Sequence, residues 1–163
     1  MKQLIVKCVC WAAAAACVCM ILFMSSETAD ESSLRSIGVS ERFAGLFIKG
    51  FKDMNPEDKQ VVLEKIHSAI RVGGHISEYA MLGVTLAAVT LNYKKIKKYR
   101  FPISAAAGLT VSVCDELYQI TVPGRAFELF DIACDLFGAA LGAGMTLVVC
   151  SIILKSVKKR QKN

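Results

Sequence analysis

The sequence predicts an all-α membrane protein with four transmembrane helices and an outer loop of one or two amphipathic helices. The chain has 163 residues, of which 54% are hydrophobic and 21% charged, and its mean hydropathy is +0.45. A water-soluble domain of this length rarely contains several long apolar runs. Four such runs each reach roughly the 20 residues that a helix needs to cross about 30 Å of hydrocarbon. They cover residues 4–24, 72–91, 101–122 and 129–154 of one domain, 1–163.

The first run could be a membrane span or a cleaved signal peptide, since Lys2 and Lys7 lie at its start. Its apolar core, from Cys8 to Met24, is longer than the hydrophobic region of most signal peptides, and no clean small-x-small cleavage site follows it. We therefore favour a membrane span.

The loop from residue 25 to 71 contains two helical patterns after a polar opening, SSETADESS. Ser40 is a suitable N-cap for the first helix, in which Phe43 and Phe47 lie on one apolar face together with Leu46 and Phe51. Such a helix either lies on the membrane surface or packs on the bundle.

The second pattern of this loop begins at Asn55-Pro56-Glu57-Asp58. These residues supply an N-cap, a proline at the first helical position and acids in the first turn. We expect this helix to lead directly into the second span, with a bend at Gly73-Gly74.

Positive charge predicts the orientation of the chain. The first seven residues, the loop 93–100 and the tail 155–163 contain Lys and Arg but no Asp or Glu, whereas the loop 25–71 contains both signs. Short cytoplasmic segments beside membrane spans are enriched in Lys and Arg. We therefore expect a multi-pass protein of the cell membrane with both termini in the cytoplasm. Such lysine clusters also attract anionic lipid, and nucleic acid is not an expected partner.

With this orientation, the polar residues of the second, third and fourth spans all lie near the outer surface. Helical spacing places them in one stripe on each span, within roughly 60–80° of arc. The stripes consist of Arg71, His75 and Glu78 on the second span, Ser112, Asp115 and Gln119 on the third, with Glu116 beside that stripe, and Glu128, Asp131 and Asp135 on the fourth. Further in, Gly138-x-x-x-Gly142 is a motif for close helix packing.

These stripes provide the groups of a polar site. His75 beside Glu78 is a candidate general acid or base whose tautomer the carboxylate would fix. Arg71 and Arg125 suit a phosphate or a carboxylate. Carboxylates can hold a divalent cation, and the candidate ligands are Asp115, Glu116, Asp131 and Asp135. The alternative is a structural network in which acids and bases neutralise one another.

At these residues the chain resembles the VanZ-like family. The similar stretches are SSETADESS, RVGGHISEYAMLG and CDELYQITVPGRAFELFDIACDLFGAALG, in that order within residues 20–145. The chain departs from the family pattern at Val72, where relatives more often have a lysine. The resemblance implies a bacterial cell-envelope membrane protein connected with resistance to the lipoglycopeptide teicoplanin. The motif positions that it carries over are His75, Glu78, Tyr79, Asp115, Glu116, Gln119, Arg125, Asp131 and Asp135.

Residues and resemblance together leave three functions open. The first is an enzyme acting on a phospholipid or lipid-linked cell-wall precursor, with catalytic residues His75, Glu78, Asp115 and Glu116 and substrate-binding residues Arg71, Tyr79, Gln119 and Arg125. The second is a non-catalytic protein that shields the membrane surface from a lipoglycopeptide antibiotic. The third, a transporter subunit, would require an oligomer, because the polar stripes stop in the outer half of the membrane.

Overall fold

The described chain folds into five α-helices and two short 3₁₀ helices, with no strand. The computed structural model describes residues 1–161 and all their side chains except that of Arg35. The elements are α1 (Lys2–Ser25), α2 (Ala29–Phe47), η1 (Phe51–Asp53), α3 (Pro56–Leu91), η2 (Lys94–Tyr99), α4 (Arg100–Gln119) and α5 (Leu129–Arg160). The all-helical class is confirmed. The predicted tail ends in Lys162 and Asn163, which lie outside the described residues.

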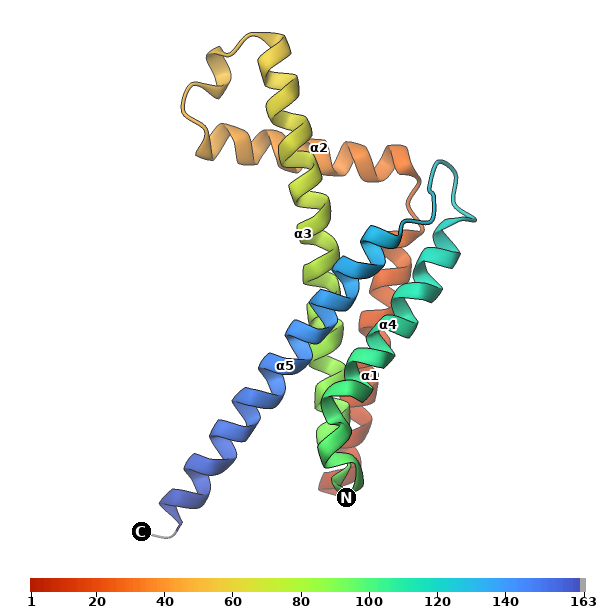
Figure 1. The fold of residues 1–163 in the computed structure, drawn as a ribbon, viewed down its shortest axis with the longest axis vertical. Coiled ribbons are helices and arrows are strands. Elements are labelled where there is room, and N and C mark those ends of the chain that lie inside the picture. Colours follow the sequence, from red (N-terminus) through yellow and green to blue (C-terminus); the bar gives the residue numbers. More distant parts are fainter. Residues whose placement is uncertain (162–163) are drawn as a thin grey trace.

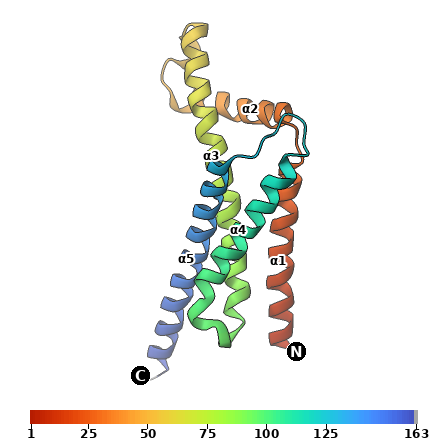
Figure 2. The same ribbon diagram turned by 45° about the vertical axis from the view of Figure 1, so that its right-hand side comes forward.

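Four helices form a bundle that α2 crosses at one end. Helices α1, α4, α5 and the second half of α3 run along the long axis of the molecule, while α2 lies across it (Figure 1). Figure 2 shows the first half of α3 continuing beyond α2, away from the bundle. The N-terminus, the α3–α4 connection and the C-terminal end of α5 lie toward the opposite end. The basic segments of the described chain therefore share one end, and α2 lies at the other.

Two helices of the described chain, α1 and α5, are long and apolar enough to cross a membrane. Both expose large apolar side chains, among them Val9 and Phe23 on α1 and Val148 and Ile152 on α5. Exposed apolar surface of this kind indicates a membrane environment. Helices α3 and α4 do not meet the same criterion, because polar side chains interrupt their apolar stretches.

Helix α2 begins well before the predicted start at Ser40. Thr28 caps it: its side chain accepts a hydrogen bond from the Glu31 backbone N–H (3.3 Å), and the Glu31 carboxylate accepts one from the Thr28 N–H (3.0 Å). This capping box starts the helix inside the segment predicted to be a polar opening. The hydrogen bond from the Thr28 backbone N–H lowers the pKa of Glu31 below its usual value. Ser40 is instead buried in mid-helix, where its hydroxyl donates to the Ser36 carbonyl.

Helix α3 begins as predicted and continues without interruption into the bundle. The Asn55 side chain accepts a hydrogen bond from the Asp58 N–H (2.8 Å), and Pro56 takes the first helical position, where its missing N–H has no cost. The helix passes through Gly73-Gly74 to Leu91. The helix predicted from Asn55-Pro56 and the second apolar run are therefore one continuous element.

Helices α3 and α5 pack backbone against backbone through three glycines. A Cβ added to Gly138 or Gly142 would collide with the carbonyl groups of Ile76 or Ala80, and one added to Gly83 would collide with Ala139. The sequence prediction of close packing at Gly138-x-x-x-Gly142 is therefore confirmed.

We predict that Gly142→Val prevents this approach and destabilises the protein. Overpacking of a tight contact costs about 1–3 kcal/mol, and a backbone neighbour cannot move aside as a side chain can. Thermal denaturation in detergent, followed by circular dichroism, should show a melting temperature several degrees lower. Gly73→Ala is the control, since no atom lies within 4 Å of its added Cβ. Equal melting temperatures for both variants would contradict the packing argument.

Candidate functional site

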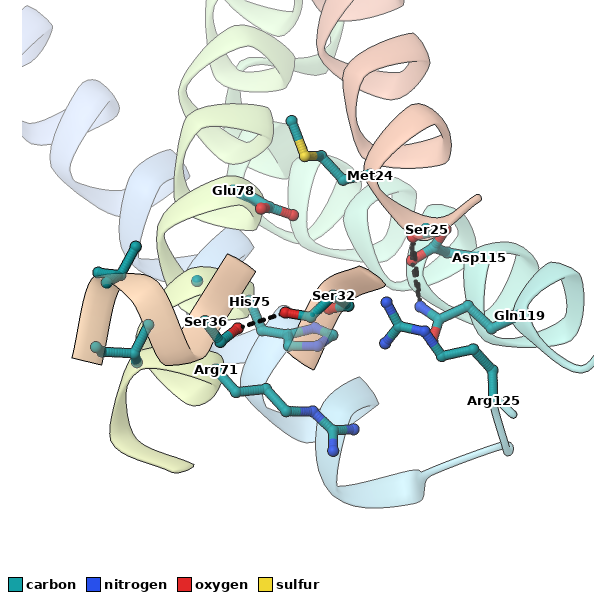
Figure 3. A pocket seen from close by; sticks show the side chains of 13 residues that line it. Met24, Ser25, Ser32, Ser36, Arg71, His75, Glu78, Asp115, Gln119 and Arg125 are labelled. Atoms are coloured by element: carbon teal, nitrogen blue, oxygen red, sulfur yellow. Dashed lines mark hydrogen bonds between the residues drawn. The ribbon is translucent and has the colours of Figure 1, made fainter. Parts of the chain in front are cut away.

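A polar cavity of about 290 Å³ lies between α2 and the end of the bundle that α2 crosses. Helices α1, α2, α3 and α4 and the α4–α5 loop all contribute to its wall, as Figure 3 shows. The lining residues are Met24, Ser25, Ser32, Ser36, Val39, Ile70, Arg71, Gly74, His75, Glu78, Asp115, Gln119 and Arg125. The volume is near the lower end of the range for small-molecule sites, roughly 300–1,000 Å³. The structure thus brings six of the predicted site residues to one cavity: Arg71, His75, Glu78, Asp115, Gln119 and Arg125.

Asp115 lies in the wall of this cavity and is 1% exposed. Its Oδ2 accepts hydrogen bonds from the Ser25 hydroxyl (2.9 Å) and the Gln119 amide (3.2 Å). Its Oδ1 is buried and has no hydrogen-bond partner among the described residues. Ser25, the last residue of α1, was not predicted as a site residue, although it opens the SSETADESS segment.

Glu116 has a different position, because it turns away from the cavity and contacts the start of α5. Its carboxylate accepts a hydrogen bond from the Glu128 backbone N–H (2.8 Å) and is completely buried. The N-terminus of a helix presents unpaired N–H groups and a partial positive charge, so a carboxylate there stabilises it. The sequence predicted a catalytic role for Glu116. In the structure it holds the start of α5 and does not line the cavity, so its catalytic role stays a prediction.

His75 is held by two carboxylates of α5. Its Nδ1 lies 2.9 Å from Asp135 Oδ1, and its Nε2 lies 3.4 Å from Asp131 Oδ2. Asp135 is fully buried, and its other oxygen accepts a hydrogen bond from the Ser112 hydroxyl (2.8 Å). The sequence assigned Glu78 as the carboxylate that fixes the histidine tautomer. That partner is Asp135, because α3 and α5 pack so closely at this level.

Arg71 bridges two carboxylates at the N-terminal end of α5. Its Nη2 lies 2.5 Å from Asp131 and 3.0 Å from Glu128. Burial lowers the pKa of Arg71, but its hydrogen bonds with Glu128 and Asp131 outweigh that effect and raise it. Arg71 is therefore a permanent cation at the rim. Its Nε is buried and has no hydrogen-bond partner in the described chain.

A tight turn directs Arg125 into the cavity. The Arg125 N–H donates to the Val122 carbonyl (3.1 Å), and Gly124 between them has a φ of 77°. Proline followed by a left-handed glycine is the pattern of a type II turn, so Pro123 and Gly124 are the residues that allow the chain to turn here. The Arg125 Nε also donates to the Glu27 carbonyl (3.3 Å). Arg125 forms no ion pair with a carboxylate of the described residues.

Two predictions about this region are not supported. Tyr79, predicted to bind substrate, is 1% exposed and packs in the core with Ile21, Leu82 and Ala139, so it does not line the cavity. Within the described residues, no three His, Cys, Asp or Glu side chains could together hold a metal ion. The predicted ligand set of Asp115, Glu116, Asp131 and Asp135 does not converge, since helix packing gives them separate partners.

Sequence reasoning missed the contribution of α2 to the cavity. Ser32 and Ser36 line it from above, and Val39 lies one turn further along the same side of the helix. The segment was predicted to be a loop because the capping box at Thr28 was not recognised. Helical spacing was therefore not applied to its serines.

Comparison of the sequence with protein-family models identifies one family. The VanZ/LLP1 family model matches residues 10–153. The chain belongs to the VanZ/LLP1 family. The match extends from α1 to the apolar part of α5 and so includes every element of the cavity in this VanZ/LLP1 protein. No curated protein and no solved structure matches the chain.

We predict that Arg71 and Asp131 stabilise the fold as a pair. In a double-mutant cycle with Arg71→Met and Asp131→Asn, the double variant should be more stable than the sum of the single effects predicts. The coupling should be about 1–2 kcal/mol, because Arg71 is 40% exposed and the pair is only partly buried.

Free energies of unfolding in detergent would measure this coupling. Arg71→Met combined with Asp58→Asn is the control cycle. Asp58 lies in the first turn of α3, far from Arg71, so the effects of these two substitutions on the free energy of unfolding should add. A coupling near zero for Arg71 and Asp131 would show that the contact contributes nothing to stability.

Proposed function

We propose that four helices of this chain cross the membrane, with both termini in the cytoplasm and the cavity at the outer face. The support is the separation of charge along the molecule. The basic segments lie toward one end, and the cavity and α2 lie at the other (Figure 1). At the basic end, the Trp11 indole donates to the Tyr93 hydroxyl (3.1 Å) and Lys7 lies over the Tyr93 ring. Aromatic and basic side chains of this kind are enriched at the membrane–water interface.

In the proposed topology, a cysteine at Asp58 is accessible to a membrane-impermeant thiol reagent in intact cells, and one at Lys98 is not. The seven native cysteines are free thiols and would first be replaced by serine or alanine. Permeabilised cells provide the control, in which both positions should react. Labelling of Lys98→Cys in intact cells would contradict the orientation.

We propose further that the cavity binds the phosphate-bearing headgroup of a membrane lipid or of a lipid-linked cell-wall precursor. The observation that carries this proposal is Arg125. Acids compensate Arg71 and His75, whereas Arg125 reaches the cavity without a carboxylate partner among the described residues. A guanidinium group matches phosphate with parallel hydrogen bonds. A lipid headgroup at the outer leaflet would lie at the depth of this cavity.

His75 supports a chemical step on that headgroup. It lines the cavity, and Asp135 behind it fixes the ring, as in sites where a histidine moves protons. Glu78 lies on the same wall, one turn further along α3. These residues would serve a headgroup-modifying enzyme connected with lipoglycopeptide resistance.

Non-catalytic shielding of the membrane surface is the second candidate. Val39 lines the cavity, and Phe43 and Leu46 follow on the same side of α2, with Phe43 and Leu46 47% and 80% exposed. At 100° per residue these three positions share one face, which would rest on the outer leaflet. A protein lying on the membrane in this way could occupy the surface that a lipid-anchored antibiotic uses.

Arg125→Gln tests headgroup binding. We expect its affinity for dodecyl phosphate to fall roughly 10- to 100-fold, because a charge-assisted hydrogen bond contributes about 1.5–3 kcal/mol. Titration calorimetry of the full chain in a neutral detergent would measure the affinity. Arg42→Gln, an exposed arginine of α2 that does not line the cavity, is the matched control.

The same variants, expressed in a sensitive bacterium, connect binding with function. If teicoplanin susceptibility and the extracted lipids both respond to Arg125→Gln, an enzyme is supported. Resistance that depends on Arg125 while the lipids stay unchanged would favour shielding. Unchanged dodecyl phosphate affinity in Arg125→Gln would contradict the proposed site.

A further inference from the structure

The wall of the cavity changes from cationic to acidic along its depth. On α3, Arg71 comes first and Glu78 seven residues later, roughly 10 Å closer to the inner end of the bundle. Arg125 lies in the loop beyond α4, whereas Asp115 lies within α4, one turn before Gln119. Figure 3 shows Arg71 and Arg125 on one side of the cavity, and Asp115 and Glu78 toward the other. Donors therefore lie at the outer rim and acceptors nearer the hydrocarbon.

Asp115 Oδ1 is a buried acceptor to which no described residue donates a hydrogen bond. The side chain is 99% buried, and its other oxygen already accepts from Ser25 and Gln119. Oδ1 has no partner in the described part of the chain, although Asp115 lines the cavity. A buried acceptor without a donor costs free energy, so a group that supplies the donor would bind with a gain.

We propose that the ligand is a phosphate-bearing amphiphile with a free hydroxyl on the hydrocarbon-chain side of its phosphate, as in a lysophospholipid. This inference rests on the proposed function, because it takes the phosphate to lie at Arg125 and the chain to point toward the membrane. The hydroxyl then lies at the level of Asp115 and donates to Oδ1. A diacyl lipid has ester groups at this level and offers no donor.

The apolar part of the cavity wall offers contact to a hydrocarbon chain. Met24 and Val39 are among its apolar members, contributed by α1 and α2. One chain can leave along such a surface.

Titration calorimetry of the full chain in neutral detergent would compare three probes. These are lysophosphatidate, an alkyl phosphate of equal chain length, and glycerol 3-phosphate. We expect lysophosphatidate to bind roughly tenfold or more tightly than the alkyl phosphate, since one hydrogen bond to a charged group distinguishes them. Glycerol 3-phosphate should bind more weakly than either, because it has no chain. Equal or tighter binding of glycerol 3-phosphate would place the ligand in solution and overturn the lipid assignment.

Asp115→Asn should abolish the preference for the hydroxyl while the variant still binds the alkyl phosphate. Asp30→Asn, which removes an acid from the first turn of α2 outside the cavity, should keep it. The comparison of probes on the unmodified protein remains decisive if Asp115→Asn does not fold. Equal affinities for lysophosphatidate and alkyl phosphate would overturn this inference and leave the phosphate site intact. Absence of binding by both would overturn the proposed function as well.

Discussion

The close contact between α3 and α5 is the constraint on which the rest of the structure depends. Gly138 and Gly142 let the α5 backbone approach the carbonyl groups of α3, and no larger residue fits there. Because the two helices are parallel, this contact fixes which residues face each other toward the cavity. Asp135 meets His75, and one turn further out Asp131 meets Arg71. Backbone packing in the inner part therefore sets the geometry of the polar outer part.

In this geometry the acidic residues of the spans have different partners. Asp131 and Asp135 hold the cationic and imidazole groups of α3, while Glu116 caps the N-terminus of α5. Asp115 differs from these three because its side chain lines the cavity, and its Oδ1 has no partner among the described residues. From the sequence, these acids could form a structural network or a ligand site. The structure shows a network along the α3–α5 contact and a cavity beside it.

Helix α2 combines a wall of the cavity with an exposed apolar surface. Its serines Ser36 and Ser40 and the fully buried Ala44 recur at a spacing of four residues, so a face of small side chains allows it to pack closely. Its large apolar residues, such as Phe43 and Phe47, remain exposed. A helix that covers a polar cavity and also presents an apolar surface suits a site at the boundary between membrane and water.

The sequence by itself determined the elements whose signals are local. Apolar length predicted α1 and α5, the Asn55-Pro56 cap predicted the start of α3, and helical spacing predicted that the acids and bases form stripes. The Thr28 capping box, which starts α2, is also a local signal of the sequence. The partner of each charged residue was decided only by the tertiary structure. Pairing depends on the register between helices, and register depends on where two backbones can touch, so neither Asp135 as the partner of His75 nor the capping role of Glu116 follows from spacing along one helix.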